Sequence, residues 1–135
     1  MLIVDTNVVA YLLIEGDYTA AARSLYGRDD DWRSEAFIMV EFVNVLTASL
    51  AAGRMKSKLA QQFLADATSL LHRKLISIPH GPVLALAVQY SVTAYDARFL
   101  AVAQQLGRRL VTEDAKLRAA APPLTQSLAE AVARY

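Results

Sequence analysis

The chain has 135 residues, 55% of them hydrophobic, and its 14 basic and 13 acidic residues give a formal net charge of +1. This length fits one domain, residues 1–135, that buries about two-thirds of its unfolded surface. A charge so near zero excludes a protein that coats nucleic acid through net charge alone. Cysteine is absent, which excludes disulfides and thiolate metal sites. No apolar run reaches the ~20 residues of a membrane span, and we expect a cytoplasmic protein without a signal leader.

Short apolar runs alternate with longer helical patterns along the chain. The apolar runs predict strands at 2–4, 34–39, 75–78 and 109–112. The helical patterns lie at 7–14, 18–26, 40–52, 57–73, 83–90, 94–106, 114–121 and 127–134. Asp17, Ser57 and Thr93 are the predicted N-caps, and Gly27 and Gly53 are predicted to end helices. Strands separated by helices favour a three-layer α/β/α fold around a short parallel sheet of four or five strands.

Four carboxylates lie in apolar surroundings: Asp5, Glu41, Asp96 and Asp114. Asp5 and Asp114 follow the first and last predicted strands, and ligand sites of parallel sheets lie beyond the carboxyl ends of the strands. Glu41 and Asp96 begin predicted helices on the apolar side, so all four can meet at one edge of the sheet. Burying an ionised carboxylate without a partner costs several kcal/mol, and a divalent cation would neutralise the group.

Each acid also has a structural explanation. Asp5 and Asp114 could cap the helices that follow them, and Glu41 and Asp96 could complement a helix dipole. The coherent placement of all four favours a shared site. The acids at 29–31 are predicted to lie in an exposed loop, and neither of the two histidines, His72 and His80, has the spacing of a metal ligand.

Four segments carry a family resemblance: residues 1–7 (MLIVDTN), 40–46 (VEFVNVL), 93–101 (TAYDARFLA) and 110–114 (LVTED). With them the chain resembles the PIN domain family, and specifically the VapC-type ribonuclease toxins of toxin–antitoxin pairs, over nearly its whole length. The resemblance implies a Mg²⁺- or Mn²⁺-dependent endoribonuclease. It implies catalytic and metal-binding roles for Asp5, Glu41, Asp96 and Asp114, with Thr112 and Asn7 in support. The residues after Asp114 depart from the family, which often has an aromatic side chain there.

An all-oxygen ligand set suits Mg²⁺ or Mn²⁺, and a water on such an ion can attack the scissile phosphorus. Asp5 and Asp96 are the first choices as direct ligands. Asn7 could fix the Asp5 carboxylate or act at the helix N-terminus. Three basic residues near the acids could contact substrate phosphates or be ordinary surface charges: Arg98, Lys116 and Arg118.

Two other functions compete with this interpretation. A haloacid dehalogenase-type phosphotransferase needs a second aspartate two positions after the first, where this chain has Asn7. A catalytically silent PIN-fold module that binds RNA or protein would not need its acids intact.

The expected partners follow from the resemblance. They are an RNA substrate, a VapB-like antitoxin whose arginine or lysine pairs with Asp96 or Glu41, and operator DNA reached only through the antitoxin. A homodimer is expected to bury the helices at 40–52 and 57–73, with Met55 between them.

Overall fold

The computed structural model describes residues 1–135. Five parallel strands form one sheet in the order β3-β2-β1-β4-β5. The strands are β1 (Leu2–Val4), β2 (Trp32–Glu35), β3 (Leu75–Ile76), β4 (Leu110–Val111) and β5 (Thr125–Gln126). The central strand β1 is buried along its whole length, as a continuous apolar run predicts.

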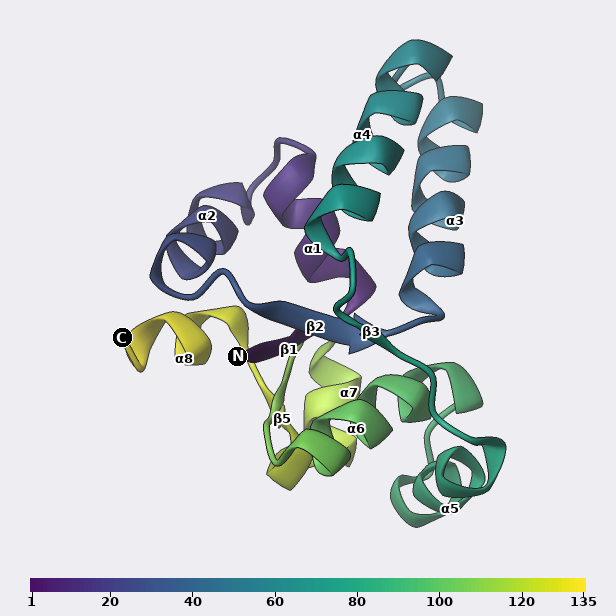
Figure 1. Cartoon of the computed structure of the whole chain (residues 1–135), viewed down its shortest axis with the longest axis vertical. Helices are drawn as coiled ribbons and strands as arrows, with labels where there is room; N and C mark the ends of the chain where they lie inside the picture. Colours follow the sequence, from purple (N-terminus) through teal and green to yellow (C-terminus); the bar gives the residue numbers. More distant parts are fainter.

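Helices cover both faces of the sheet and give the predicted three layers (Figure 1). One face carries α1 (Thr6–Leu13), α2 (Thr19–Arg28), α3 (Ile38–Ala51) and α4 (Ser57–Leu70). The other carries α5 (His80–Tyr90), α6 (Ala94–Leu106) and α7 (Ala115–Ala120). A 3-10 turn (Pro122–Leu124) precedes β5, and α8 (Leu128–Ala133) packs against α2. None of these helices has the length and apolar character needed to cross a membrane.

The helix ends confirm two of the predicted signals and correct three. The Thr93 hydroxyl caps α6 by accepting the Asp96 N–H at 3.1 Å, and Gly53 follows α3 with a φ of 71°. Asp17 caps nothing, because α2 starts at Thr19, whose own hydroxyl bridges Gly16 and Ile14. Ser57 is the first residue of α4 rather than its cap, and Gly27 lies inside α2.

The predicted strand at 34–39 is wrong in position. The strand is Trp32–Glu35, and the apolar run that follows it is already the start of α3. β2 carries polar residues because neighbouring elements satisfy them: the Ser34 hydroxyl donates to the Val4 carbonyl at 2.7 Å. The predicted strands at 75–78 and 109–112 and the helix at 57–73 are shorter than expected, and β5 had no apolar run to predict it.

The loop at 29–31 is not simply exposed. Asp29 is partly buried and accepts from the Met1 amine at 2.7 Å and from the Tyr135 hydroxyl at 2.8 Å. Its backbone carbonyl also accepts from the indole N–H of Trp32. Both ends of the chain therefore lie beside this loop (Figure 1).

Candidate active site

All four predicted acids line one cavity of about 220 Å³. Asp5 and Asp114 come from the carboxyl ends of β1 and β4, Glu41 comes from the first turn of α3, and Asp96 from the first turn of α6. Thr6, Asn7, Asn44, Val45, Phe99 and Leu117 complete the lining. No lysine, arginine or histidine lies among these residues, so the cavity is uniformly acidic.

Asp5 is both a helix cap and the most perturbed acid of the cavity. Its Oδ1 accepts the Val8 N–H at 3.1 Å, which caps α1. The pKa of Asp5 is raised from 3.8 to about 6, mainly by burial and to a smaller extent by the charges of Glu41 and Asp114, while the hydrogen bonds with Thr112 and Val8 oppose the rise. Asp5 therefore caps α1 and lines the cavity at the same time.

Asp96 feels the charge of Asp114 across the cavity. Burial, followed by the charge of Asp114, raises the pKa of Asp96, while its hydrogen bond with Thr93 opposes the rise. Asp114 caps α7 through the Leu117 N–H at 3.1 Å, and its own N–H donates to the Thr112 hydroxyl at 3.1 Å. Thr112 thus contacts both strand-end acids.

Glu41 is held by a residue that the sequence did not single out. The Thr6 hydroxyl, which is buried, donates to Glu41 Oε1 at 2.6 Å. Asn44 also lines the cavity, one helical turn after Glu41. The spacing of three residues from Glu41 was the available signal for Asn44. Thr6 gave none, because contact between α1 and α3 depends on the tertiary fold.

The family profile described as PIN domain matches residues 2–122. The chain belongs to the PIN domain family. PIN domains are typically nucleases, and they usually use divalent metal ions. No curated protein sequence matches the chain.

A solved structure supports the fold. The chain is similar to the crystal structure of PAE2754 from Pyrobaculum aerophilum, with a TM-score of 0.76 and 22% sequence identity, covering 98% of this chain and 93% of that one. At this identity the likeness establishes the three-layer fold that carries the acids.

The acidic cavity of this PIN domain suits a hard divalent cation by its chemistry. Its donors are carboxylate, hydroxyl and amide oxygens, and the raised pKa of Asp5 reflects burial of a charge that no basic side chain in the cavity neutralises. The structure has no group of three or more histidine, cysteine, aspartate or glutamate side chains arranged to hold an ion. Mg²⁺ is usually held by one or two carboxylates and keeps several waters, so it does not need such a group.

The other predicted site residues do not line the cavity, apart from Asn7. Asn7 makes no hydrogen bond with Asp5, and the N-cap of α1 is Asp5 itself. Arg98 pairs with the buried Glu35 at 3.4 Å, and Arg118 donates to the Thr112 carbonyl at 2.9 Å. Lys116 is exposed on α7 and has no partner within the chain.

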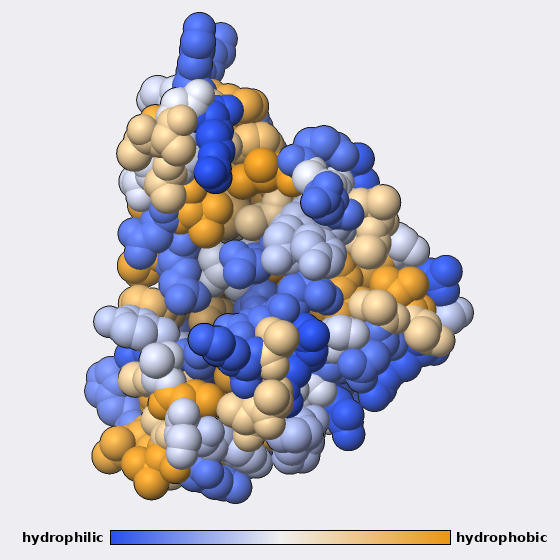
Figure 2. Space-filling view, turned by 180° about the vertical axis from the view of Figure 1, so that it is seen from behind, coloured by the Kyte–Doolittle hydropathy of each residue, from blue (hydrophilic) through white to orange (hydrophobic).

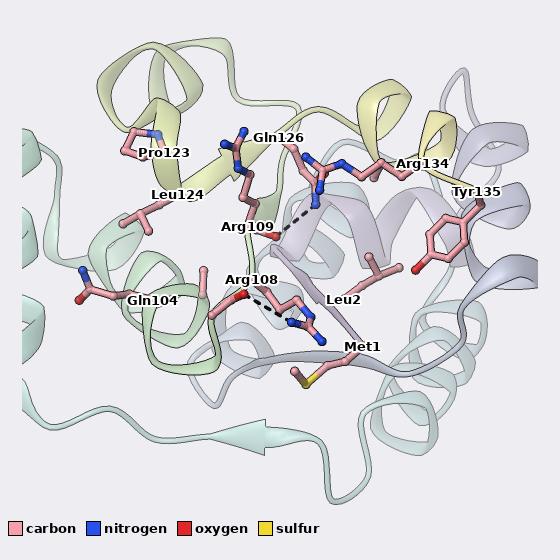
Figure 3. A pocket seen from close by; sticks show the side chains of 13 residues that line it. Met1, Leu2, Gln104, Arg108, Arg109, Pro123, Leu124, Gln126, Arg134 and Tyr135 are labelled. Atoms are coloured by element: carbon pink, nitrogen blue, oxygen red, sulfur yellow. Dashed lines mark hydrogen bonds between the residues drawn. The ribbon is translucent and has the colours of Figure 1, made fainter.

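A larger cavity, of about 580 Å³ (Figure 3), lies at the other end of the strands from the acids. It is formed around Leu2 and Arg109, at the amino ends of β1 and β4. Arg108 and Arg134 also line it, and no carboxylate side chain does. The acids that define the candidate active site are therefore confined to the smaller cavity.

Proposed function

We propose that this PIN domain is a Mg²⁺- or Mn²⁺-dependent endoribonuclease of the VapC type, acting in the cytoplasm. The observation that carries the proposal is the cavity lined by Asp5, Glu41, Asp96 and Asp114 without any basic residue. Such a cavity repels a bare phosphodiester, so substrate binding requires a cation between the carboxylates and the phosphate. Family membership supports hydrolysis of a nucleic acid as the reaction.

Each acid has a distinct part in this proposal. Asp5 and Asp96 would hold the cation, and Glu41 and Asp114 would add negative charge around it. A bound divalent cation supplies a water activated for attack and screens the negative charge of the phosphate. Thr6 fixes the Glu41 carboxylate, and Thr112 orients Asp5. Lys116 is the basic residue best placed to meet a phosphate, because Arg98 and Arg118 are engaged inside the chain.

Cleavage of a mixed RNA pool tests the activity. The wild type should cleave RNA with Mg²⁺ or Mn²⁺ and stop when EDTA is added. Asp96→Asn should lower the rate by at least about a thousandfold, because it removes a metal ligand. Asp17→Asn, which makes the same change on an exposed residue outside the cavity, is the matched control. Cleavage that persists in EDTA, or in Asp96→Asn, would contradict the proposal.

We further propose that the protein is the toxin of a VapBC-type pair. An arginine or lysine from the antitoxin tail would enter the acidic cavity, pair with Asp96 or Glu41 and displace the cation, since bidentate arginine–carboxylate pairs are strong. Operator DNA would be reached only through the antitoxin.

Growth of a bacterial host separates this role from an unpaired nuclease. Wild-type expression should arrest growth, the antitoxin should restore it, and Asp5→Asn should be harmless. Normal growth with abundant, folded wild type would contradict the toxin role.

The alternative is a catalytically silent module that binds RNA or protein. The lack of a ready-made three-residue metal site is the observation in its favour. RNA binding by the wild type without cleavage, at saturating Mn²⁺, would select it.

A further inference from the structure

An aromatic pair lies beside the acidic cavity. The rings of Phe37 and Tyr95 are stacked, with centroids 5.4 Å apart and planes 28° from parallel. Tyr95 directly precedes Asp96 in α6, and the Phe37 carbonyl accepts the N–H of Glu41 at 3.2 Å. The pair therefore joins the two helix starts that deliver these acids. Neither ring lines the cavity itself, so the pair borders the site.

The Phe37 ring is held by the buried Glu35 and the partly buried Arg98. Glu35, which is 1% exposed, accepts the Phe37 N–H at 2.7 Å and pairs with Arg98 at 3.4 Å. The Arg98 guanidinium lies 5.3 Å from the centroid of the Phe37 ring, within the range of a cation–π contact. Tyr95 and Arg98 are three residues apart on α6, so one face of the helix presents both to Phe37. The sequence left Arg98 open between a phosphate contact and an ordinary surface charge; in the structure it pairs with Glu35 and lies over the Phe37 ring.

The outer ring is open to solvent. Tyr95 is 58% exposed although it is stacked on Phe37. A large flat ring, supported from below and exposed beside a phosphate-handling cleft, is how proteins bind unpaired bases, because every base can stack on it. Recognition of RNA in single strands commonly uses such aromatic side chains.

We propose that Tyr95, supported by Phe37, is a stacking subsite for a nucleobase of single-stranded RNA, next to the phosphate bound over the acidic cavity. This proposal rests on the proposed function. The ligand is a base of any sequence, since a ring face without polar groups accepts all bases. The subsite anchors the strand and takes no part in the chemistry.

The test compares two labelled ligands: a short adenosine RNA oligomer and a ribose-phosphate oligomer of equal length without bases. Their affinities for the wild type, Tyr95→Phe and Tyr95→Leu are measured by fluorescence anisotropy with Ca²⁺ in place of Mg²⁺ or Mn²⁺, so that a divalent cation is present for the phosphate. The wild type should prefer the oligomer with bases. In Tyr95→Leu the ratio of the two affinities should fall by about five-fold to a hundred-fold, the range of one base–aromatic contact. Tyr95→Phe, which keeps the ring, should retain it.

An unchanged preference in Tyr95→Leu would overturn the subsite. The manganese-dependent cleavage rate, measured on the same proteins, separates this failure from that of the proposed function. Cleavage by the wild type with an unchanged preference in Tyr95→Leu rejects the subsite alone. No cleavage, together with a lost preference in Tyr95→Leu, rejects the nuclease and leaves a base-binding subsite on a silent module. Tyr95→Leu should also keep the wild-type dependence of rate on Mn²⁺ concentration, which a displaced Asp96 would alter.

Discussion

At the scale of single residues, the acids of the cavity combine structural and chemical roles. Asp5 caps α1 and Asp114 caps α7, so the structural explanation of these two residues is correct. The capping bonds do not remove the acids from the cavity, which both still line. One aspartate can therefore cap a helix and line the site at the same time, because the capping hydrogen bond holds its carboxylate next to the backbone that follows the strand.

Asp5 should destabilise the metal-free protein at neutral pH. Its pKa of about 6 in the folded protein lies above the value of 3.8 for an unperturbed aspartate, so the folded state holds the proton more tightly. The contribution of Asp5 to stability is therefore greatest below pH ~4 and is lost as the pH rises through ~6. Asp5→Asn keeps a capping oxygen. At pH 8 its free energy of unfolding should be about 3 kcal/mol higher than that of the wild type.

Urea unfolding of both proteins in EDTA, at pH 5 and pH 8, measures this effect. The difference between wild type and Asp5→Asn should grow with pH, and comparing the two proteins removes the contributions of the other acids. Mn²⁺ should narrow the difference by stabilising only the wild type. An equal difference at both pH values would refute the explanation by burial of charge.

Thr6 tests whether the Glu41 carboxylate must be held in position for cleavage. Its hydroxyl donates to Glu41 at 2.6 Å, and Thr6→Val removes that bond at nearly constant volume. We expect the cleavage rate to fall about tenfold while the free energy of unfolding changes by about 1 kcal/mol. Thr6→Ser keeps the hydroxyl and should retain most of the rate. Equal rates for Thr6→Val and wild type would mean that Glu41 needs no such support.

Among the helices and strands, the sequence predicted best those whose positions depend on local signals. The apolar run at β1 and the Thr93 cap of α6 predicted those elements closely, because burial and capping act within a few residues. The prediction for β2 failed because its polar residues are satisfied by distant partners, such as the Val4 carbonyl for Ser34. The four acids were predictable as a group from strand ends and helix starts. Thr6 and the Phe37–Tyr95 pair were not, because they depend on how helices meet.

Glu35 should hold β2, α3 and α6 together. It accepts from the backbone N–H groups of Phe37 and Ile78 and pairs with Arg98. Glu35→Ala leaves these donors without an acceptor and should lower the free energy of unfolding by about 3 kcal/mol. Glu35→Gln keeps an acceptor and should cost less than half of that. Urea denaturation measures both, and a loss below about 1 kcal/mol for Glu35→Ala would contradict the role.

In the whole molecule, α3 and α4 expose apolar side chains at the end where they pack together. Val40, Val43 and Leu59 on α3 and α4 are 52%, 40% and 47% exposed, and Figure 2 shows hydrophobic residues at the surface of this end. Exposed apolar groups on neighbouring helices are typical of interfaces. The proposed homodimer would cover them.

Two separate variants, each with one lysine on a different helix, test the dimer. Val43→Lys puts a charge into the α3–α4 surface and should give a monomer by light scattering at micromolar concentration. Val88→Lys, on α5 at a residue 73% exposed, is the matched control and should stay dimeric. A monomeric wild type at the same concentration would refute the dimer.

The proposed function requires that the acidic cavity cleave RNA only when a divalent cation is bound. The most direct measurement is the initial rate of RNA cleavage as a function of Mn²⁺ concentration for wild type and Asp5→Asn. The wild-type rate should rise from zero in EDTA to a plateau, and Asp5→Asn should stay near zero throughout the titration. Cleavage by Asp5→Asn at the wild-type rate, or a wild-type rate independent of Mn²⁺, would contradict the claim.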